Sequence, residues 1–487
     1  MTILFIDPVT LKTTGSTELG KAVLSSAVKT VEPEVAKELS STSDWRKRYQ
    51  GAFAKVAKAE FKNPQAMLEV AINGLAEFEK RLVTDSGENL VEVVRTAWRT
   101  NKDLVATVVV KGVGPKAKPE VKGELTISEM LSKHLAEPGI EADLKILSKN
   151  SNYSIENDLL TALAGGAEYS PTRLWLDWGG ATAIVARSRE ELWQELIARA
   201  RSGGGTLYVP VLKSKLNGVD AQALSDLELA KVAGLDLVED HSAIAGWLSM
   251  LARSETRRLV LGGYAYAPGA KHIQVQGVQH ALGRVLTESL PKSRVVLTWL
   301  ATPTDSHVVP VQFAHDIQSR FASRSAFTKF RDFLYGAREH KPLVFKDDSG
   351  GEFALIDPTS SLQGSSYALA KRVQRWMAYQ QLASDRKVIY LVSPPAHTDS
   401  VLSHRILRAS YAGAPHFGLV PFKTDSAVSL AACLLLAELS KPTQEDKVGS
   451  TSLYTRLAVH GGLWRSIYRP NDLWRAATVR GIFGYFK

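Results

Sequence analysis

A tyrosine and a lysine four residues apart, Tyr367 and Lys371, form the sharpest local chemical signal in this sequence. They open a stretch with helical character, and residues four apart lie on the same side of a helix. A lysine ammonium close to a phenol lowers the pKa of the phenol, which suits tyrosine to proton transfer. Because this spacing also occurs by chance in many long chains, the elements around the pair must decide whether it belongs to a site.

The segments on both sides of the pair place polar residues directly after predicted strands. The strand predicted at residues 353–356 runs into a hydroxyl-rich turn. The hydroxyl residues of that turn are Thr359, Ser360 and Ser361. The strand predicted at residues 388–392 runs into a turn that contains Pro394 and Thr398. A site built from Tyr367 and Lys371 would therefore have hydroxyl groups and turns available beside it.

From Asp143 onward, short apolar runs alternate with helical stretches, which predicts βαβ units and a largely parallel sheet. The runs are almost continuously apolar, as buried parallel strands require. The predicted strands are residues 144–147, 183–186, 206–212, 258–261, 294–300, 353–356 and 388–392. An insertion at roughly 305–348 separates the two candidates for the fifth strand, 294–300 and 353–356. We expect an α/β fold with a doubly wound, mostly parallel, Rossmann-like sheet.

The regions on both sides of these predicted βαβ units differ from them in predicted secondary structure and composition. The N-terminal region is mainly helical after a short strand, and Pro64 marks either a break or a new first helical turn. A later segment is rich in Gly, Pro and Lys, which is typical of a linker. The expected organisation is a helical domain (1–111), a linker (112–140), a Rossmann-like domain (141–446) and a basic aromatic C-terminal arm (447–487).

The order of these motifs resembles that in the short-chain dehydrogenase/reductase family. The alternation of strands and helices is similar to that in ketoreductase domains of type I fatty acid synthases. The resemblance covers roughly 300 of the 487 residues and rests on pattern and short matches. In that family the tyrosine is the acid, the lysine holds the ribose of the cofactor and tunes the tyrosine, and a serine orients the carbonyl. The resemblance implies these roles for Tyr367, Lys371 and one of Thr359, Ser360 or Ser361.

The same resemblance places a nucleotide-binding turn between the first predicted strand and a helix at residues 159–164. In the family this turn carries several glycines, because the backbone must approach the pyrophosphate closely. The turn here, residues 148–154, has no glycine, and Tyr153 would crowd a phosphate, so we expect weak cofactor binding. Arg187 and Arg189 follow the second strand, where the 2′-phosphate of NADP would lie. The residues implied in cofactor binding are Ser148, Asn150, Ser154, Arg187, Arg189, Pro394 and Thr398.

The composition excludes some classes of protein and leaves the partner open. The single cysteine, Cys433, excludes an intramolecular disulfide and a cysteine-built metal site, and the histidines show no metal-binding spacing. No apolar run reaches the length of a membrane span and the N-terminus lacks signal-peptide features, so we expect a cytoplasmic protein. The net charge of +10 favours an anionic partner, such as nucleic acid, lipid headgroups or a phosphorylated cofactor, although many proteins are modestly basic without one.

The C-terminal segment interleaves aromatic and basic residues. Residues 447–487 carry seven Lys or Arg against one acidic residue, Asp472. The segment could pack against the core or a second subunit, bind an anionic polymer, or touch membrane headgroups. We favour a neighbouring subunit, contacted through residues 461–487, and hence a homo-oligomer or larger assembly. The aromatic residues concerned are Trp464, Tyr468, Trp474, Phe483, Tyr485 and Phe486.

Two functions from different classes are consistent with these features. The first is an NADPH-dependent, ketoreductase-like protein that acts on the carbonyl of an acyl or thioester substrate, with Tyr367 and Lys371 facing one cleft at the C-terminal edge of the sheet. The missing glycines make a catalytically degenerate descendant equally consistent. The second is a non-enzymatic structural or assembly protein, such as a coat or scaffold subunit, whose basic surfaces serve nucleic acid or subunit contacts.

Overall fold

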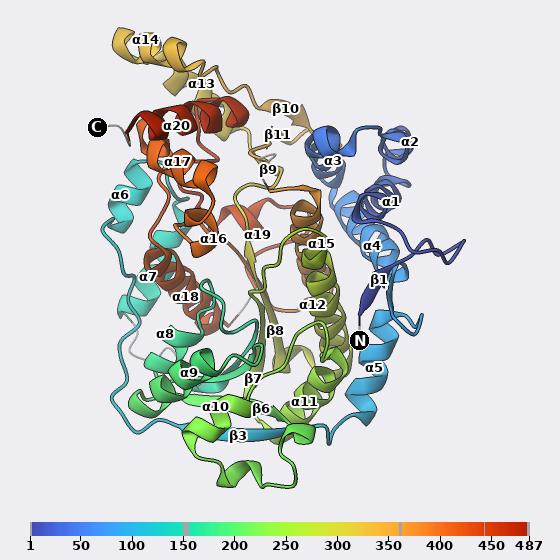
Figure 1. Cartoon of the computed structure of the whole chain (residues 1–487). Helices are drawn as coiled ribbons and strands as arrows, with labels where there is room; N and C mark the ends of the chain where they lie inside the picture. The colour runs from blue at the N-terminus through green and yellow to red at the C-terminus, as the bar shows by residue number, and fades with distance from the viewer. Residues whose placement is uncertain (1, 150–154, 360–362, 443, 485–487) are drawn as a thin grey trace.

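The computed structural model describes residues 2–149, 155–359, 363–442 and 444–484, and shows an α/β protein built around one large sheet (Figure 1). The strands of the sheet are β3 (Val105–Lys111), β4 (Asp158–Leu163), β5 (Ala181–Val185), β6 (Thr206–Leu212), β7 (Arg258–Gly263), β8 (Val295–Ala301) and β12 (Val388–Val392). Their order is β12-β8-β7-β4-β5-β6-β3. All neighbours are parallel except β3, which pairs antiparallel with β6 at one edge. The expected α/β class with a mostly parallel sheet is confirmed.

Helices cover both faces of this sheet. One face carries α11 (His241–Ser254), α12 (Ala270–Ser289) and α15 (Ser365–Ala383), and the other carries α7 (Gly139–Lys149), α8 (Thr172–Asp177), α9 (Glu190–Ser202) and α18 (Thr424–Ser440). Every residue of β4 is buried, and alternate residues of a strand point to opposite faces. Leu159 and Leu163 therefore join the core beneath α11, α12 and α15, whereas Leu160 and Ala162 join the core beneath α7, α8 and α18.

The first hundred residues form a helical layer that packs on the face carrying α11, α12 and α15 (Figure 1). The elements are β1 (Ile3–Phe5), α1 (Ser16–Val28), α2 (Pro33–Ser41), α3 (Trp45–Glu60), α4 (Pro64–Lys80), β2 (Leu82–Thr84) and α5 (Leu90–Thr100). Pro64 is the first residue of α4, and the side chain of Asn63 caps that helix, so the new first turn predicted there is confirmed. A short helix, α6 (Ile127–Ser132), lies within residues 112–140.

The first parallel strand lies one element later in the chain than predicted. Residues 144–147 belong to helix α7, which packs against α18, so the strand predicted there is wrong. Residues 159–164, predicted as a helix, contain most of the central strand β4. Periodicity alone cannot distinguish a buried strand from a buried helical segment in so short an apolar run. Ser148 therefore lies in a helix instead of a turn, and Asn150 and Ser154 lie outside the described residues.

An insertion of small elements separates β8 from α15. It contains β9 (His307–Pro310), α13 (Gln312–Ala322), α14 (Ala326–Tyr335), β10 (Leu343–Lys346) and β11 (Glu352–Ile356). These three strands form a separate antiparallel sheet in the order β10-β11-β9. Of the two candidates for the fifth strand, 294–300 corresponds to β8 of the central sheet and 353–356 belongs to the small sheet. The strand of the central sheet that precedes Tyr367 is therefore β8.

The region after β12 folds back onto the rest of the chain. Its elements are α16 (Asp399–Leu402), α17 (Arg405–Gly413), the 3-10 helix η5 (Ala414–Phe417), α19 (Ser452–Thr455) and α20 (Pro470–Gly484), which flank α18 in the chain. Trp464 packs on His307 and Tyr468 packs on Phe417, and both rings are buried. A neighbouring subunit is therefore not what covers these two rings, and that expectation is wrong for them. The remaining rings are the half-buried Trp474, the exposed Phe483, and Tyr485 and Phe486, which lie outside the described residues.

Within the described part of the chain, no helix combines the length and the apolar character that crossing a membrane requires.

Candidate functional site

A cavity of about 1020 Å³ opens at the C-terminal ends of the parallel strands. The strand order runs outward from β4 in both directions, with β5 and β6 on one side and β7, β8 and β12 on the other. In open α/β sheets, ligands bind in the crevice at the point where the order reverses. The walls are the segments after β4, β5, β7, β8 and β12, together with the first turns of α12 and α15. The topology therefore places the cavity where a ligand site is expected.

Six of the residues predicted to form a site line this one cavity. They are Arg187, Arg189, Tyr367, Lys371, Pro394 and Thr398. The prediction that Tyr367 and Lys371 face a shared cleft at this edge of the sheet is confirmed. Thr359 is buried, does not line the cavity, and bonds through its hydroxyl to a neighbouring carboxylate. Ser360 and Ser361 lie outside the described residues.

Tyr367 and Lys371 are close together but are not directly coupled. The lysine Nζ lies 5.6 Å from the centroid of the tyrosine ring and donates to the carbonyl of Leu300 (2.8 Å) and the side-chain oxygen of Gln374 (3.3 Å). Burial raises the pKa of Tyr367 above its ordinary value, an effect that the nearby Thr302 hydroxyl partly opposes. The expected lowering of the phenol pKa by the lysine is therefore wrong. Burial also lowers the pKa of Lys371, to about 8.

A histidine that the sequence did not single out stacks on the tyrosine. The rings of His272, from the first turn of α12, and Tyr367 have centroids 5.2 Å apart. Burial and the charge of Lys371 lower the pKa of His272 to about 3, so the imidazole is neutral. Its Nδ1 accepts from the amide of Ala267 (3.1 Å), which leaves the proton on Nε2. That Nε2 is buried and has no hydrogen-bond partner among the described residues, so its proton is unsatisfied.

Thr302 takes the place in the cleft that was expected for the hydroxyl turn at 359–361. It directly follows β8, lines the cavity, and bonds to the hydroxyl of Thr304 (2.7 Å). The sequence did contain a signal for Thr302. Two hydroxyl residues, Thr302 and Thr304, follow residues 294–300, which are one of the two candidates for the fifth strand. The turn at 359–361 was predicted instead because it follows the predicted strand that directly precedes Tyr367 in the sequence.

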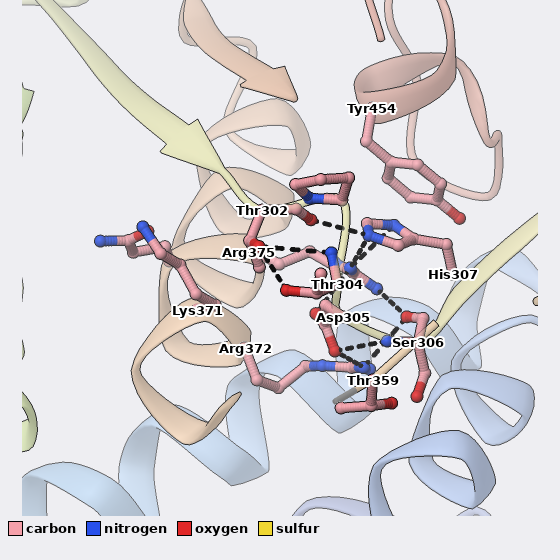
Figure 2. A network of polar contacts seen from close by, with 12 residues as sticks. Thr302, Thr304, Asp305, Ser306, His307, Thr359, Lys371, Arg372, Arg375 and Tyr454 are labelled. Atoms are coloured by element: carbon pink, nitrogen blue, oxygen red, sulfur yellow. Dashed lines mark hydrogen bonds and ion pairs between the residues drawn. The ribbon is translucent and has the colours of Figure 1, made fainter. Parts of the chain in front are cut away.

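A buried ion network holds α15 against the segment after β8 (Figure 2). The guanidinium of Arg372 bonds to Glu60 (2.8 Å) and Asp305 (2.9 Å), and that of Arg375 bonds to the other oxygen of Asp305 (2.7 Å). The four side chains are at most 2% exposed, and their formal charges balance. Figure 2 shows both arginines directed into the network and Lys371 directed away from it. One helix thus presents its cleft residues and its anchoring residues on different sides.

The network extends to Thr302 through His307. Arg375 donates to Nδ1 of His307 (2.9 Å), and the other ring nitrogen lies 3.2 Å from the carbonyl oxygen of Thr302. Burial holds the pKa of His307 well below its ordinary value, so the ring is neutral and its Nε2 proton faces that carbonyl. The position of Thr302 relative to Tyr367 therefore depends on ion pairs that lie outside the cleft.

The loop after β4 determines whether a dinucleotide fits the crevice. The phenol of Tyr169 donates to the carbonyl of Pro394 (2.9 Å), and the carboxylate of Glu168 accepts from the amide of Asp399 (3.2 Å). In open α/β sheets the pyrophosphate lies against the backbone of this first loop. Here a bulky phenol bridges the crevice and a carboxylate carries negative charge beside it. The residues present therefore do not fit a dinucleotide that spans the crevice.

Two glycines of this loop serve packing, because side chains fill the space around them. A Cβ atom added to Gly165 would lie 2.3 Å from the side chain of Ile184, and one added to Gly166 would lie 2.5 Å from Leu192. Such contacts would force the strand and helix apart. The sequence does contain adjacent glycines in the true first loop, but they were assigned to the end of a helix.

The opposite end of the cavity has a different chemistry. Arg187 and Arg189 are exposed, line the cavity, and have no ion-pair partner in the described part of the chain. Two guanidinium groups at the end of β5 would suit a phosphate or another anionic group. The cleft thus combines a donor-rich inner end with a cationic rim.

Comparison with known proteins does not assign this chain to a family. A scan against protein-family models and a search of curated proteins found no match. The resemblance to short-chain dehydrogenases therefore stays a prediction based on the residues themselves.

Proposed function

We propose that this protein binds a small apolar ligand in the cleft and holds its carbonyl oxygen against Tyr367, without turning over a nicotinamide cofactor. The observation that carries the proposal is that three polar side chains close to one another line the same cavity. These are the phenol of Tyr367, the Nε2–H of His272 and the hydroxyl of Thr302. Aromatic and apolar side chains line the same cavity, as ligand sites for apolar molecules require.

The strand order supports a Rossmann-like origin for this cleft. Counted from β4, the order is third, second, first, fourth, fifth, sixth, which is that of the doubly wound dinucleotide-binding sheet. Helices on both faces agree with double winding. A descendant of that class would keep the cleft and the Tyr367–Lys371 helix while losing the first-loop features that accept a pyrophosphate.

The protonation states of the cleft suit an acceptor ligand. Because burial raises the pKa of Tyr367, the phenol is protonated throughout the neutral range and donates one hydrogen bond. The neutral imidazole of His272 donates a second through Nε2. A carbonyl oxygen has two lone pairs and can accept both. Lys371 already donates to the carbonyl of Leu300 and to the side chain of Gln374. Its role is therefore to fix the wall of the cavity and not to contact the ligand.

The first test compares the binding of a medium-chain β-oxoacyl thioester by the wild type and by Tyr367→Phe, measured by titration calorimetry. We expect the variant to bind about tenfold more weakly, because it loses one hydrogen bond to the carbonyl. Tyr266→Phe is the matched control. Tyr266 also lines the cleft but is 64% exposed, so its loss should change affinity little. No binding by the wild type, or equal binding by all three proteins, would contradict the proposal.

The second candidate is an NADPH-dependent carbonyl reductase that acts on an acyl or thioester substrate. It is favoured by Arg187 and Arg189 at the end of β5, where a 2′-phosphate would lie, and by the pairing of Tyr367 with Lys371. It requires the bridge between Tyr169 and Pro394 to open and Glu168 to leave the crevice.

NADPH affinity distinguishes the two candidates. We expect weak binding by the wild type in a fluorescence titration. The double variant Glu168→Gln, Tyr169→Gly should bind at least about tenfold more tightly, because it removes the carboxylate and the bridging phenol. Tyr266→Gly is the control for simply enlarging the cleft and should give no gain. Submicromolar binding by the wild type, with NADPH oxidation in the presence of the thioester, would show that the reductase is the correct function.

A further inference from the structure

Helix α14 carries an exposed apolar face that no described residue covers. Phe327 is 78% exposed, Phe330 60%, Phe333 81% and Leu334 63%. Positions 327, 330 and 334 recur at helical spacing, and Phe333 lies beside them. We name these four side chains the α14 face. Figure 1 shows α14 at the outer end of the molecule, beyond α13 and α20. Soluble monomers seldom leave so many large apolar side chains together in water.

The opposite side of α14 is firmly anchored, so the exposed face is a fixed feature of the fold. Asp332, the only acidic residue of the helix, is 2% exposed and bonds to Arg324, to Arg331 (2.8 Å) and to the hydroxyl of Tyr468 (3.0 Å). Arg331 also donates to the carbonyl of His416 in η5 (2.8 Å). The acidic group of α14 therefore points inward, and its apolar residues point outward.

The surface around the α14 face is strongly basic. α17 packs along α20, α20 packs on η5, and η5 bonds to α14, so these elements lie together at one end of the molecule (Figure 1). The segments 324–341, 399–416 and 465–484 contain eleven Lys or Arg and four Asp or Glu. Two of these acids, Asp332 and Asp472, are buried in ion pairs. Exposed cations without an ion-pair partner among the described residues include Lys329, Arg405 and Arg475.

We propose that the α14 face and its basic surroundings dock on a membrane surface that contains anionic lipids. Phenylalanine and leucine side chains enter the boundary between headgroups and acyl chains, while lysine and arginine contact the headgroups. A second copy of the chain would bring two positive surfaces together, which charge repulsion opposes. A nucleic acid would meet the cations but would leave the apolar face uncovered. Of these three partners, only an anionic lipid surface would contact both the apolar side chains and the surrounding cations.

The basic surroundings of the α14 face share two helices with the wall of the cleft. Leu407 and Tyr411 of α17 and Trp474 of α20 line the cavity described above. The helices that form part of the basic surface thus also wall the ligand site. The docking proposal itself depends only on α14 and its surroundings and stands whether or not the cleft binds a carbonyl ligand.

Vesicle flotation with the full chain tests the proposal. We expect the protein to float with vesicles of phosphatidylcholine and phosphatidylglycerol, and to bind vesicles of phosphatidylcholine alone at least about tenfold more weakly. Binding to the mixed vesicles should weaken as salt is raised, because exposed charges are screened. Absence of flotation with the mixed vesicles, or equal binding to both kinds, would overturn the proposal.

Two variants separate the apolar and the charged contributions. The triple variant Phe327→Ser, Phe330→Ser, Phe333→Ser and the charge-reversal variant Lys329→Glu, Arg475→Glu should each reduce binding roughly tenfold or more. All five positions are exposed, so circular dichroism and melting temperature should be unchanged. The matched control removes three exposed apolar side chains elsewhere and should bind as the wild type does. Its substitutions are Val9→Ser, Val113→Ser and Leu227→Ser.

The same variants also show whether a second subunit or a nucleic acid covers this surface instead. If light scattering shows a dimer that the triple serine variant converts to a monomer, and no protein floats, the α14 face is a subunit interface and the proposal is wrong. If nucleic acid co-purifies and is lost only on charge reversal, again without flotation, the surface serves nucleic acid.

Discussion

Replacement of Asp305 by asparagine is expected to lower the free energy of unfolding by about 3–5 kcal/mol. The substitution keeps the shape of the side chain but leaves the guanidinium groups of Arg372 and Arg375 facing a neutral amide in the interior. Glu60 alone would then balance two buried positive charges. Urea unfolding followed by tryptophan fluorescence measures the loss, and the midpoint should fall strongly.

The control is the same substitution in an exposed pair of similar geometry. Arg201 bonds to both oxygens of Asp226, but the two side chains are about half exposed. Asp226→Asn should therefore cost less than about 1 kcal/mol, because water replaces the lost partner. Equal losses for both variants would mean that burial is not the source of the effect.

The effect of Asp305 should depend on pH. Burial alone would raise the pKa of this carboxyl, but the charges of Arg372 and Arg375 outweigh it and hold the pKa at about 2. A carboxyl whose folded pKa lies below its unfolded value of about 4 stabilises the fold above that value, and this stability is lost as pH falls through the folded pKa. The difference between the wild type and Asp305→Asn should therefore be complete at neutral pH and should shrink between about pH 4 and pH 2.

The parts of the site that could be predicted from the sequence depend on local information. Tyr367 and Lys371 are one helical turn apart, and Arg187 and Arg189 directly follow a strand. Parallel strands bring such segments to one edge of the sheet, whatever the sequence between them. Knowledge of the strand pattern was therefore enough to predict a shared cleft.

The parts that could not be predicted depend on residues distant in the chain. Glu60 bonds to Arg372 across 312 positions, and nothing local marks either residue as buried. Thr302 is separated from Tyr367 by the insertion that contains the small sheet, and the strand 353–356 of that insertion lies nearer to Tyr367 in the sequence. Nothing local marks His272, because its stacking on Tyr367 joins α12 and α15, which are far apart in the chain.

One short segment caused the largest error. The apolar run at β4 is compatible with a strand or a buried helix, and assigning it to a helix moved the nucleotide loop to residues 148–154. The true first loop contains Gly165, Gly166 and the bridging Tyr169. The expectation of weak cofactor binding therefore rests on Tyr169 instead of Tyr153.

Replacement of Trp464 by alanine is expected to cost about 3–5 kcal/mol of unfolding free energy, measured by the same urea titration. The indole is fully buried, packs on the rings of His307 and His460, and donates to the carbonyl of Pro303 (2.9 Å). Its removal would leave a large cavity beside the segment that positions Thr302. The tail that carries it is thus part of the core of the molecule and not a detachable arm.

A matched substitution in the same tail separates burial from position in the chain. Phe483→Ala should change stability by no more than about 0.5 kcal/mol, because that ring is 60% exposed. Deletion of residues 461–487 should produce an unfolded or insoluble chain, because it removes Trp464 and the buried Tyr468 together. A truncated chain that melts like the wild type would show that the contacts between Trp464 and the histidine rings contribute nothing to the fold. A stable truncated chain of smaller particle mass would instead restore the subunit-contact role first expected for this segment.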